Sequence, residues 1–236
     1  MVQAVAGAGK TTFLLNQLNL ENNVALITYT KNNQEQLKEN IIKKFGYYPN
    51  NIHVFGLFEF LYNFCYRPLQ NKYPITGICF DHPSPYLKGF HHKDGRIYSN
   101  QISRLLLAEK INYLTRIERF FDYFYIDEVQ DIAADDFDWL MSLKDLKIPV
   151  TLVGDFYQST FVSSRRGNKG KAIYSSIENY KNQFDQNGFH FEESKLIASH
   201  RCSKSVSHFI QENLNIRMES HRDDVTNIEL LTDIER

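Results

Sequence analysis

The sequence has few cysteines and no long hydrophobic run, and each of these shortages excludes a class of protein. Its 236 residues include 3 cysteines. Such scattered thiols cannot form the disulfide framework of a small secreted domain, and they favour a reducing, cytoplasmic location. No stretch is long and apolar enough to cross a membrane, and the first residues lack the charged and then apolar pattern of a signal peptide. We therefore expect a cytoplasmic protein with no membrane partner.

An excess of charge of one sign is also missing. The chain carries 27 basic and 28 acidic residues, a formal net charge of -1. A nucleic-acid partner is compatible with this balance only if the basic surface is local. Hydrophobic residues make up 42% and charged residues 23%, which is typical of a globular rather than a disordered chain. With 18 Phe and 14 Tyr, the chain has enough aromatic rings for stacking surfaces as well as for a core.

The first motif is the stretch VQAVAGAGKTT, which has the form of a phosphate-binding loop. A short apolar run ends in a glycine-rich turn, and Lys10 and Thr11 open a helix. In such loops the backbone N–H groups cradle phosphates, the lysine reaches the β- and γ-phosphates, and a hydroxyl binds Mg²⁺. Ala4 stands where the strict pattern has its first glycine, so the alternative is an ordinary glycine-rich turn before a helix. The residues expected around the nucleotide phosphates are Ala6, Gly7, Ala8, Gly9, Lys10, Thr11 and Thr12.

Apolar runs of strand length alternate with amphipathic segments along the chain. Strands are expected at residues 24–29, 52–55, 124–126, 150–153 and 192–198, and helices at 10–19, 32–45, 58–66, 100–116, 135–144 and 203–213. This alternation is typical of an α/β fold with a parallel sheet flanked by helices. The phosphate loop, Asp127 and Asp155 all follow predicted strands, at the sheet edge where ligands bind in open α/β folds.

The second motif is the acidic pair Asp127 and Glu128 in the stretch IDEVQD. Asp127 suits a ligand of Mg²⁺, and Glu128 suits a base that takes the proton of the water attacking the γ-phosphorus. Standing alone, the pair is better explained as a polar strand end or a helix cap. Downstream of Lys10 and Thr11, it predicts an ATPase. A second acidic cluster, at residues 135–138, is expected to be the solvated first turn of a helix.

Further polar side chains follow the later strands. Gln158 comes after the strand in LVGDFYQ, where an amide can sense the γ-phosphate or orient the attacking water. Arg201 lies in SHRCS between a strand and a helix, where a guanidinium can stabilise transferring phosphoryl charge as an arginine finger. Their alternatives are an ordinary turn glutamine and a surface ion pair.

The order of these motifs resembles that of the UvrD/Rep-type helicases of superfamily 1. The stretches AxAGxGKT, LITYTKNNQEQL, IDEVQD, LVGDFYQSTF and SHRCSKSV are similar to motifs I, Ia, II, III and IV of that family. The resemblance implies a RecA-like P-loop NTPase domain at residues 1–66 and 99–214, with a small loop-rich accessory insertion at 67–98. Residues 215–236 would be the start of a second domain or a tail. Such a domain couples hydrolysis of ATP, with Mg²⁺, to movement along single-stranded DNA.

The resemblance also implies a role for each matching residue. Lys10, Glu128, Gln158 and Arg201 would be catalytic. Thr11 and Asp127 would hold the metal, and His200 stands where the family has a tyrosine that stacks on adenine. The residues that match the DNA-facing motifs Ia and Ib are Thr28, Tyr29, Thr30, Lys31, Phe55 and Phe58. Gly56 departs from the polar residue usual in the second of these motifs, which leaves base contacts there open.

Larger departures from the family leave the function of the whole chain open. The upstream glutamine motif, which reads adenine, has no room before Val2, and motifs V and VI do not follow motif IV. This pattern is expected of a fragment or a reduced protein, with a protein partner as a source of the second domain. The alternative function is a nucleotide-binding regulatory module or a helicase remnant without unwinding activity, within a repair or defence complex.

The predicted insertion combines basic and aromatic residues. Its basic side chains are Arg67, Lys72, Lys88, Lys93 and Arg96, and its aromatic ones include Tyr73, Phe80, Tyr86 and Phe90. Such a combination binds single strands by stacking on bases, or it forms the small aromatic core of a loop-rich subdomain.

Overall fold

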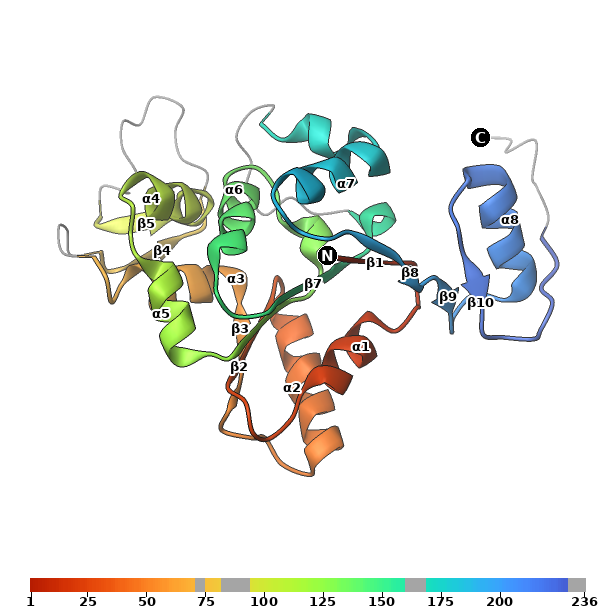
Figure 1. Ribbon diagram of the computed structural model, residues 1–236, viewed down its shortest axis with the longest axis horizontal. Coiled ribbons are helices and arrows are strands. Elements are labelled where there is room, and N and C mark those ends of the chain that lie inside the picture. Colours follow the sequence, from red (N-terminus) through yellow and green to blue (C-terminus); the bar gives the residue numbers. More distant parts are fainter. Residues whose placement is uncertain (71–74, 82–93, 160–168, 229–236) are drawn as a thin grey trace.

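The computed structural model describes residues 1–70, 75–81, 94–159 and 169–228 (Figure 1). Its centre is a 6-stranded sheet with the order β3-β2-β6-β7-β1-β8, here called the central sheet. Its strand pairs are parallel. The strands are β1 (Val2–Ala4), β2 (Val24–Thr28), β3 (Ile52–Gly56), β6 (Tyr123–Ile126), β7 (Val150–Gly154) and β8 (Glu192–Leu196). The predicted α/β fold with a parallel sheet is therefore confirmed.

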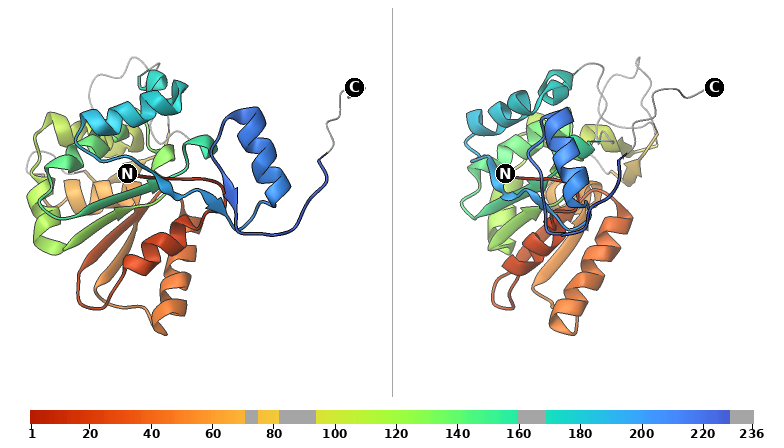
Figure 2. Two further views of the ribbon diagram at one scale, coloured as in Figure 1. Left: turned by 45° about the vertical axis from the view of Figure 1, so that its right-hand side comes forward. Right: turned by 90° about the vertical axis from the view of Figure 1, so that its right-hand side faces the viewer.

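Helices cover both faces of the central sheet. Figures 1 and 2 show α1 and α2 on one face and α4, α6 and α7 on the other. The helices are α1 (Lys10–Gln17), α2 (Lys31–Phe45), α3 (Leu57–Glu59), α4 (Ile102–Ala108), α5 (Tyr113–Phe120), α6 (Asp135–Ser142), α7 (Ile177–Gln186) and α8 (Lys204–Leu214). Every residue of β2 is buried because helices cover both faces of this parallel strand, and all of its residues except Thr28 are apolar.

Local signals in the sequence set the ends of several helices. The Thr30 hydroxyl accepts a hydrogen bond from the N–H of Asn33, at 3.1 Å, and so caps the start of α2. Gly46 ends α2 in the left-handed conformation, with φ of 82°. The Ser203 hydroxyl caps α8 in the same way as Thr30 caps α2, by accepting from the N–H of Val206 at 3.4 Å.

Other helices differ from the prediction. The helix expected at residues 100–116 is divided into α4 and α5, because Lys110 adopts a φ of 51° and Asn112 caps a new helix start. The helix expected at 58–66 begins as α3 and continues as a π-helical segment, Phe60–Tyr66. Helix α7 was not predicted, although Ile177, Tyr180 and Phe184 recur at helical spacing.

At the start of α6, Asp135 and Asp136 are buried and Asp138 is exposed, so the expectation of a solvated helix turn is wrong for the first two residues. Asp135 and Asp136 are 3% and 0% exposed. The Ser103 hydroxyl donates to Asp136 at 2.6 Å. Lys169 Nζ lies 2.5 Å from an Asp135 oxygen and 2.5 Å from an Asp138 oxygen. These partners are distant in the sequence, so composition around α6 cannot reveal them.

The last described residues form a small unit beside the central sheet. Strand β9 (Ala198–Ser199) pairs in parallel with β10 (Glu219–Ser220). Figure 2 shows α8 and β10 to one side of the helix-covered sheet. Their apolar contacts with the phosphate loop run through Val5, Ala8 and Met218.

The predicted insertion is described only in part. Strands β4 (Gly77–Cys79) and β5 (Arg96–Tyr98) form a 2-stranded parallel sheet. Most of the basic and aromatic residues expected to bind single strands there, at 71–74 and 82–93, lie outside the described residues. None of the helices in the described ranges is long and apolar enough to span a membrane.

Candidate functional site

The loop between β1 and α1 has the backbone of an anion-binding turn. Gly7 and Gly9 adopt φ values of 73° and 82°, a region in which a side chain is strained. Gly9 is the N-cap of α1, and no side chain caps this helix start. The backbone N–H groups of Gly7, Gly9, Lys10 and Thr11 have no acceptor among the described residues. The loop therefore presents unpaired donors at the positive end of a helix dipole, as a phosphate site requires.

Lys10 faces the carboxylates that follow β6. Its Nζ lies 3.5 Å from Glu128 Oε2. Asp127 is 4% exposed, and burial together with the neighbouring Glu128 raises its pKa to about 7, although Lys10 acts in the opposite direction. This buried negative charge is only partly compensated, a deficit that a divalent cation would offset. The Thr11 hydroxyl and the Asp127 carboxylate are oxygen donors of the kind that Mg²⁺ prefers, so the residues fit that ion.

Gln130 fixes the orientation of Glu128. Its amide Nε2 donates to Glu128 Oε2 at 2.7 Å, and its Oε1 accepts from the N–H of Asp155 at 2.9 Å. A Cβ atom on Gly154 would lie 2.7 Å from Gln130 Oε1, so glycine is needed for this close approach. Gln130 therefore ties the acidic loop to the end of β7. This role was not predicted, although Gln130 stands within the IDEVQD motif.

Asp155 and Gln3 extend the same network to β1. The Gln3 amide Nε2 lies 3.5 Å from Asp155 Oδ1, and Gln3 Oε1 accepts from the N–H of Phe156 at 3.1 Å. Asp155 is 1% exposed, and burial raises its pKa to about 6, against the opposing effects of Lys10 and of the Tyr157 N–H. Buried amides thus connect the carboxyl ends of β6, β7 and β1. Asp155 was expected at this edge of the sheet, without a role of its own. Gln3 was not predicted to belong to the site, although it is a polar side chain in the otherwise apolar strand β1.

The turn at residues 199–202 packs directly on the phosphate loop. The Ser199 hydroxyl donates to the carbonyl of Ala6 at 2.7 Å, and the N–H of His200 donates to the carbonyl of Gly7 at 3.0 Å. A Cβ atom on Gly7 would lie 2.7 Å from Arg201 Cβ. The structure therefore brings Arg201 and His200, both exposed, beside the predicted phosphate loop.

The structure does not join the side chains of Gln158 and Thr28 to the phosphate loop by hydrogen bonds. Gln158 is exposed on a short turn, Phe156–Gln158, and its side chain makes no hydrogen bond within the described part of the chain. Thr28 is 1% exposed, and its hydroxyl has no hydrogen-bond partner among the described residues. In this conformation, neither the exposed amide nor the buried hydroxyl contacts the phosphate loop.

Three of the residues matched to DNA-facing motifs, Tyr29, Lys31 and Phe58, border a groove beside the ends of β2 and β3, whereas the Thr30 side chain caps α2. The volume of the groove is about 610 Å³. The ring centroids of Tyr29 and Phe58 are 5.9 Å apart, and those of Phe58 and Phe80 are 5.8 Å apart. The groove is lined by Tyr29, Lys31, Gln34, Glu35, Lys38, Gly56, Leu57, Phe58, Glu59 and Phe80. Phe55 does not line it and packs instead against Phe60, with centroids 5.4 Å apart.

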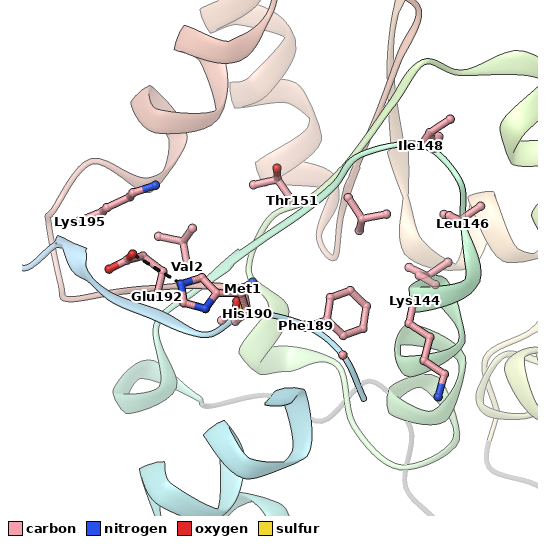
Figure 3. A pocket seen from close by; sticks show the side chains of 13 residues that line it. Met1, Val2, Lys144, Leu146, Ile148, Thr151, Phe189, His190, Glu192 and Lys195 are labelled. Atoms are coloured by element: carbon pink, nitrogen blue, oxygen red, sulfur yellow. Dashed lines mark hydrogen bonds and ion pairs between the residues drawn. The ribbon is translucent and has the colours of Figure 1, made fainter. Parts of the chain in front are cut away.

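A separate cavity lies at the opposite edge of the central sheet (Figure 3). Its volume is about 340 Å³, and its wall includes Val2, Thr151 and Glu192, which stand near the beginnings of β1, β7 and β8. His190 Nε2 and Glu192 Oε2 are 3.9 Å apart on its rim. The phosphate loop follows the carboxyl end of β1, so this cavity takes no part in the nucleotide site.

No protein-family model and no curated protein matches this sequence. Similar solved structures include the PRRSV helicase, with 15% identity and a TM-score of 0.43, covering 93% of this chain and 34% of that one. They also include Bacteroides sp Pif1 in complex with ADP-AlF4, with 16% identity and a TM-score of 0.35, covering 81% and 36%. The chain thus spans about a third of the length of these structures. At these identities and TM-scores, the likeness does not show a function for this chain.

Proposed function

We propose that this chain binds and hydrolyses ATP with Mg²⁺ and belongs to a helicase or translocase of the UvrD/Rep type that acts on single-stranded DNA. One observation carries the proposal. The unpaired N–H groups of the phosphate loop, Lys10 and the carboxylates of Asp127 and Glu128 converge at one edge of the central sheet. This set supplies phosphate binding, a metal ligand and a base within one site.

The binding step uses groups that are unpaired or only loosely paired in the structure. The loop N–H groups and Lys10 receive the phosphates, and Thr11 and Asp127 hold the metal. Bound Mg²⁺ neutralises phosphate charge during transfer. Because the Lys10 ammonium lies 3.5 Å from Glu128 Oε2, it partly neutralises this carboxylate while no phosphate is bound. When Lys10 turns to the phosphates, Glu128 loses this counter-charge.

The hydrolytic step uses Glu128 as the base and positive groups around the phosphates. Gln130 holds one Glu128 oxygen at 2.7 Å, which leaves the other oxygen for the attacking water. Arg201, beside the loop, stabilises the charge that develops on the transferred phosphoryl group. Gln158 contributes a γ-phosphate contact after a rearrangement of its exposed turn. His200 is proposed to stack on the adenine.

The groove beside β2 and β3 is the proposed path of single-stranded DNA. Tyr29 and Phe58 offer rings for base stacking, and Lys31 offers a charge for a phosphate. Glu35 and Glu59 balance the charges of Lys31 and Lys38, so stacking is expected to contribute more than electrostatic attraction. Phe58→Ala should weaken stimulation of ATP hydrolysis by oligo(dT) roughly 5- to 100-fold, given about 1–3 kcal/mol per stacked base. The exposed Phe120→Ala, outside the groove, is the matched control.

Steady-state ATP hydrolysis, with and without single-stranded DNA, tests the proposal. We expect DNA-stimulated turnover that falls by roughly 10²–10⁴-fold in Glu128→Gln, which keeps the shape of the side chain and removes the base. Turnover that ignores both DNA and this substitution would refute it. ATP binding without turnover would favour the regulatory module instead.

The proposal also includes a cytoplasmic location and a protein partner that contributes a second RecA-like domain. It gains support if the chain alone hydrolyses ATP but leaves a forked duplex intact. Unwinding by the chain alone would refute the need for the partner.

A further inference from the structure

The Ser199 hydroxyl is fully engaged between the phosphate loop and the turn that carries Arg201. It donates to the Ala6 carbonyl at 2.7 Å and accepts from the N–H groups of Arg201 and Cys202 at 3.1 and 3.0 Å. A hydroxyl has one donor and two acceptor sites, so every site is used. Ser199 is 0% exposed. If the hydroxyl is removed and the surrounding backbone does not move, water cannot reach the site to replace these hydrogen bonds.

The contact leaves no room for the turn to move toward the loop. A Cβ atom on Gly7 would lie 2.7 Å from Arg201 Cβ and 2.8 Å from Ser199 Oγ. The N–H of His200 also donates to the Gly7 carbonyl. These bonds use carbonyl oxygens of the loop, so the loop N–H groups stay available to phosphates. The turn and an occupied loop are therefore compatible.

The other side of the turn is held by the segment that contains β10. The N–H of His221 donates to the Ser199 carbonyl at 2.9 Å, and Ser220 Oγ donates to the Cys202 carbonyl at 2.7 Å. The rings of His200 and His221 stack with centroids 4.1 Å apart. The backbone around Arg201 is thus fixed from both sides. Within the described part of the chain, the hydrogen bonds from this turn to the phosphate loop come from Ser199 and His200.

We propose that Ser199 is a positioning residue that holds Arg201 beside the phosphates through its bonds to the loop and to the turn. The inference rests on the proposed ATP site. Ser199 touches no reacting atom, and its effect on turnover passes through Arg201. Without the hydroxyl, Arg201 retains its charge, but its backbone is no longer held at a fixed position beside the phosphate loop. Stabilisation of the transition state therefore falls more than nucleotide binding does.

A double-mutant cycle between Ser199 and Arg201 tests this inference. The unsubstituted chain, Ser199→Ala, Arg201→Ala and the double variant are compared for kcat of ATP hydrolysis and for ADP affinity. We expect Ser199→Ala to lower kcat at least about 10-fold, with ADP affinity changed less than about 3-fold. In the Arg201→Ala background, the same change should alter kcat less than about 2-fold, because the residue it positions is gone.

Ser203→Ala is the matched control. Its hydroxyl is also buried and caps α8, but it makes no bond to the phosphate loop. It should lower thermal stability without an effect on kcat that depends on Arg201. Ser199→Thr keeps the hydroxyl and is expected to retain Arg201-dependent turnover, which gives a second variant if Ser199→Ala does not fold.

The outcomes distinguish failure of the Ser199 positioning role from failure of the proposed ATP site. Multiplicative losses of kcat in the double variant, or full kcat in folded Ser199→Ala, would overturn the positioning role while Glu128-dependent turnover persists. Loss of Arg201-dependent turnover in a folded Ser199→Thr would also overturn it. Absence of any nucleotide binding by the unsubstituted chain would overturn the proposed function and this inference together.

Discussion

Asp127 is a buried carboxylate that costs stability when it ionises. Its pKa is about 7 in the folded chain, raised from 3.8 mainly by burial. Between these values the folded state binds more protons than the unfolded state, so the free energy of unfolding falls as the pH rises. The stabilising effect of the proton is complete below about pH 4 and is lost above about pH 7. Such a loss is consistent with the proposed role of Asp127 as a ligand of Mg²⁺.

Asp127→Asn should therefore stabilise the nucleotide-free chain at alkaline pH. Asparagine keeps the shape and cannot ionise, so its advantage should reach on the order of 2–4 kcal/mol at pH 8 and vanish near pH 4. Urea unfolding at pH 4, 6 and 8, without Mg²⁺, measures this difference. Asp145→Asn removes the same charge from an exposed site and is the control. If the variant is no more stable than the unsubstituted chain at pH 8, ionisation of Asp127 does not destabilise the folded chain.

Gly7 and Gly46 allow backbone strain to be separated from steric contact. Both have positive φ, but a Cβ on Gly46 meets nothing within 4 Å, whereas one on Gly7 meets Arg201 and Ser199. Gly46→Ala should cost about 1–2 kcal/mol of stability from conformation alone. Gly7→Ala should cost more and should lower ATP affinity at least about 10-fold, because the turn at 199–202 must move. Equal effects of both changes, by thermal unfolding and nucleotide titration, would contradict the close packing of the turn on the loop.

At the scale of elements, the site depends on buried amides that join neighbouring strand ends. Gln130 bridges the acidic loop after β6 and the end of β7, and Gln3 bridges β7 and β1. The carboxyl ends of parallel strands meet at one edge of a sheet, but their loops still need cross-links to hold side chains in register. The amides provide them without adding charge to a site that already contains buried carboxylates.

Gln130→Ala should uncouple the acidic loop from β7. The Asp155 N–H loses its acceptor and Glu128 loses its donor, so stability should fall by about 1–3 kcal/mol. We expect kcat to fall roughly 10-fold with ATP affinity nearly unchanged, since the base is misoriented while the loop is intact. Gln36→Ala, on the exposed face of α2, is the control. A loss confined to ATP affinity would speak against this orienting role.

Elements were predictable where the signal is local. The end of α2 at Gly46 and its buried Leu37 follow from glycine preference and helical spacing. The break between α4 and α5 was missed, because the apolar spacing continues across Lys110 while the backbone does not. The burial of Asp136 was also missed, since its partner Ser103 lies on another helix.

At the scale of the whole molecule, the candidate site was predictable in its position but not in its connections. Lys10, Asp127 and Glu128 were placed by motif and by strand ends, and the structure brings Lys10 and Glu128 within 3.5 Å. The bond from Ser199 to Ala6 joins residues 193 positions apart, and no periodicity or local propensity encodes it. The resemblance to a helicase family stays a prediction, as do the assigned residue roles.

Equilibrium titration is the direct test of whether the phosphate loop binds ATP with Mg²⁺. A fluorescent ATP analogue is titrated with Mg²⁺ into the unsubstituted chain and into Lys10→Ala. We expect saturable binding to the unsubstituted chain and binding that is roughly 10- to 100-fold weaker in Lys10→Ala. The difference is the effect of losing a charge-assisted contact of about 1.5–3 kcal/mol. Binding that is absent from the unsubstituted chain, or equally tight without Lys10, would contradict the proposed ATP site.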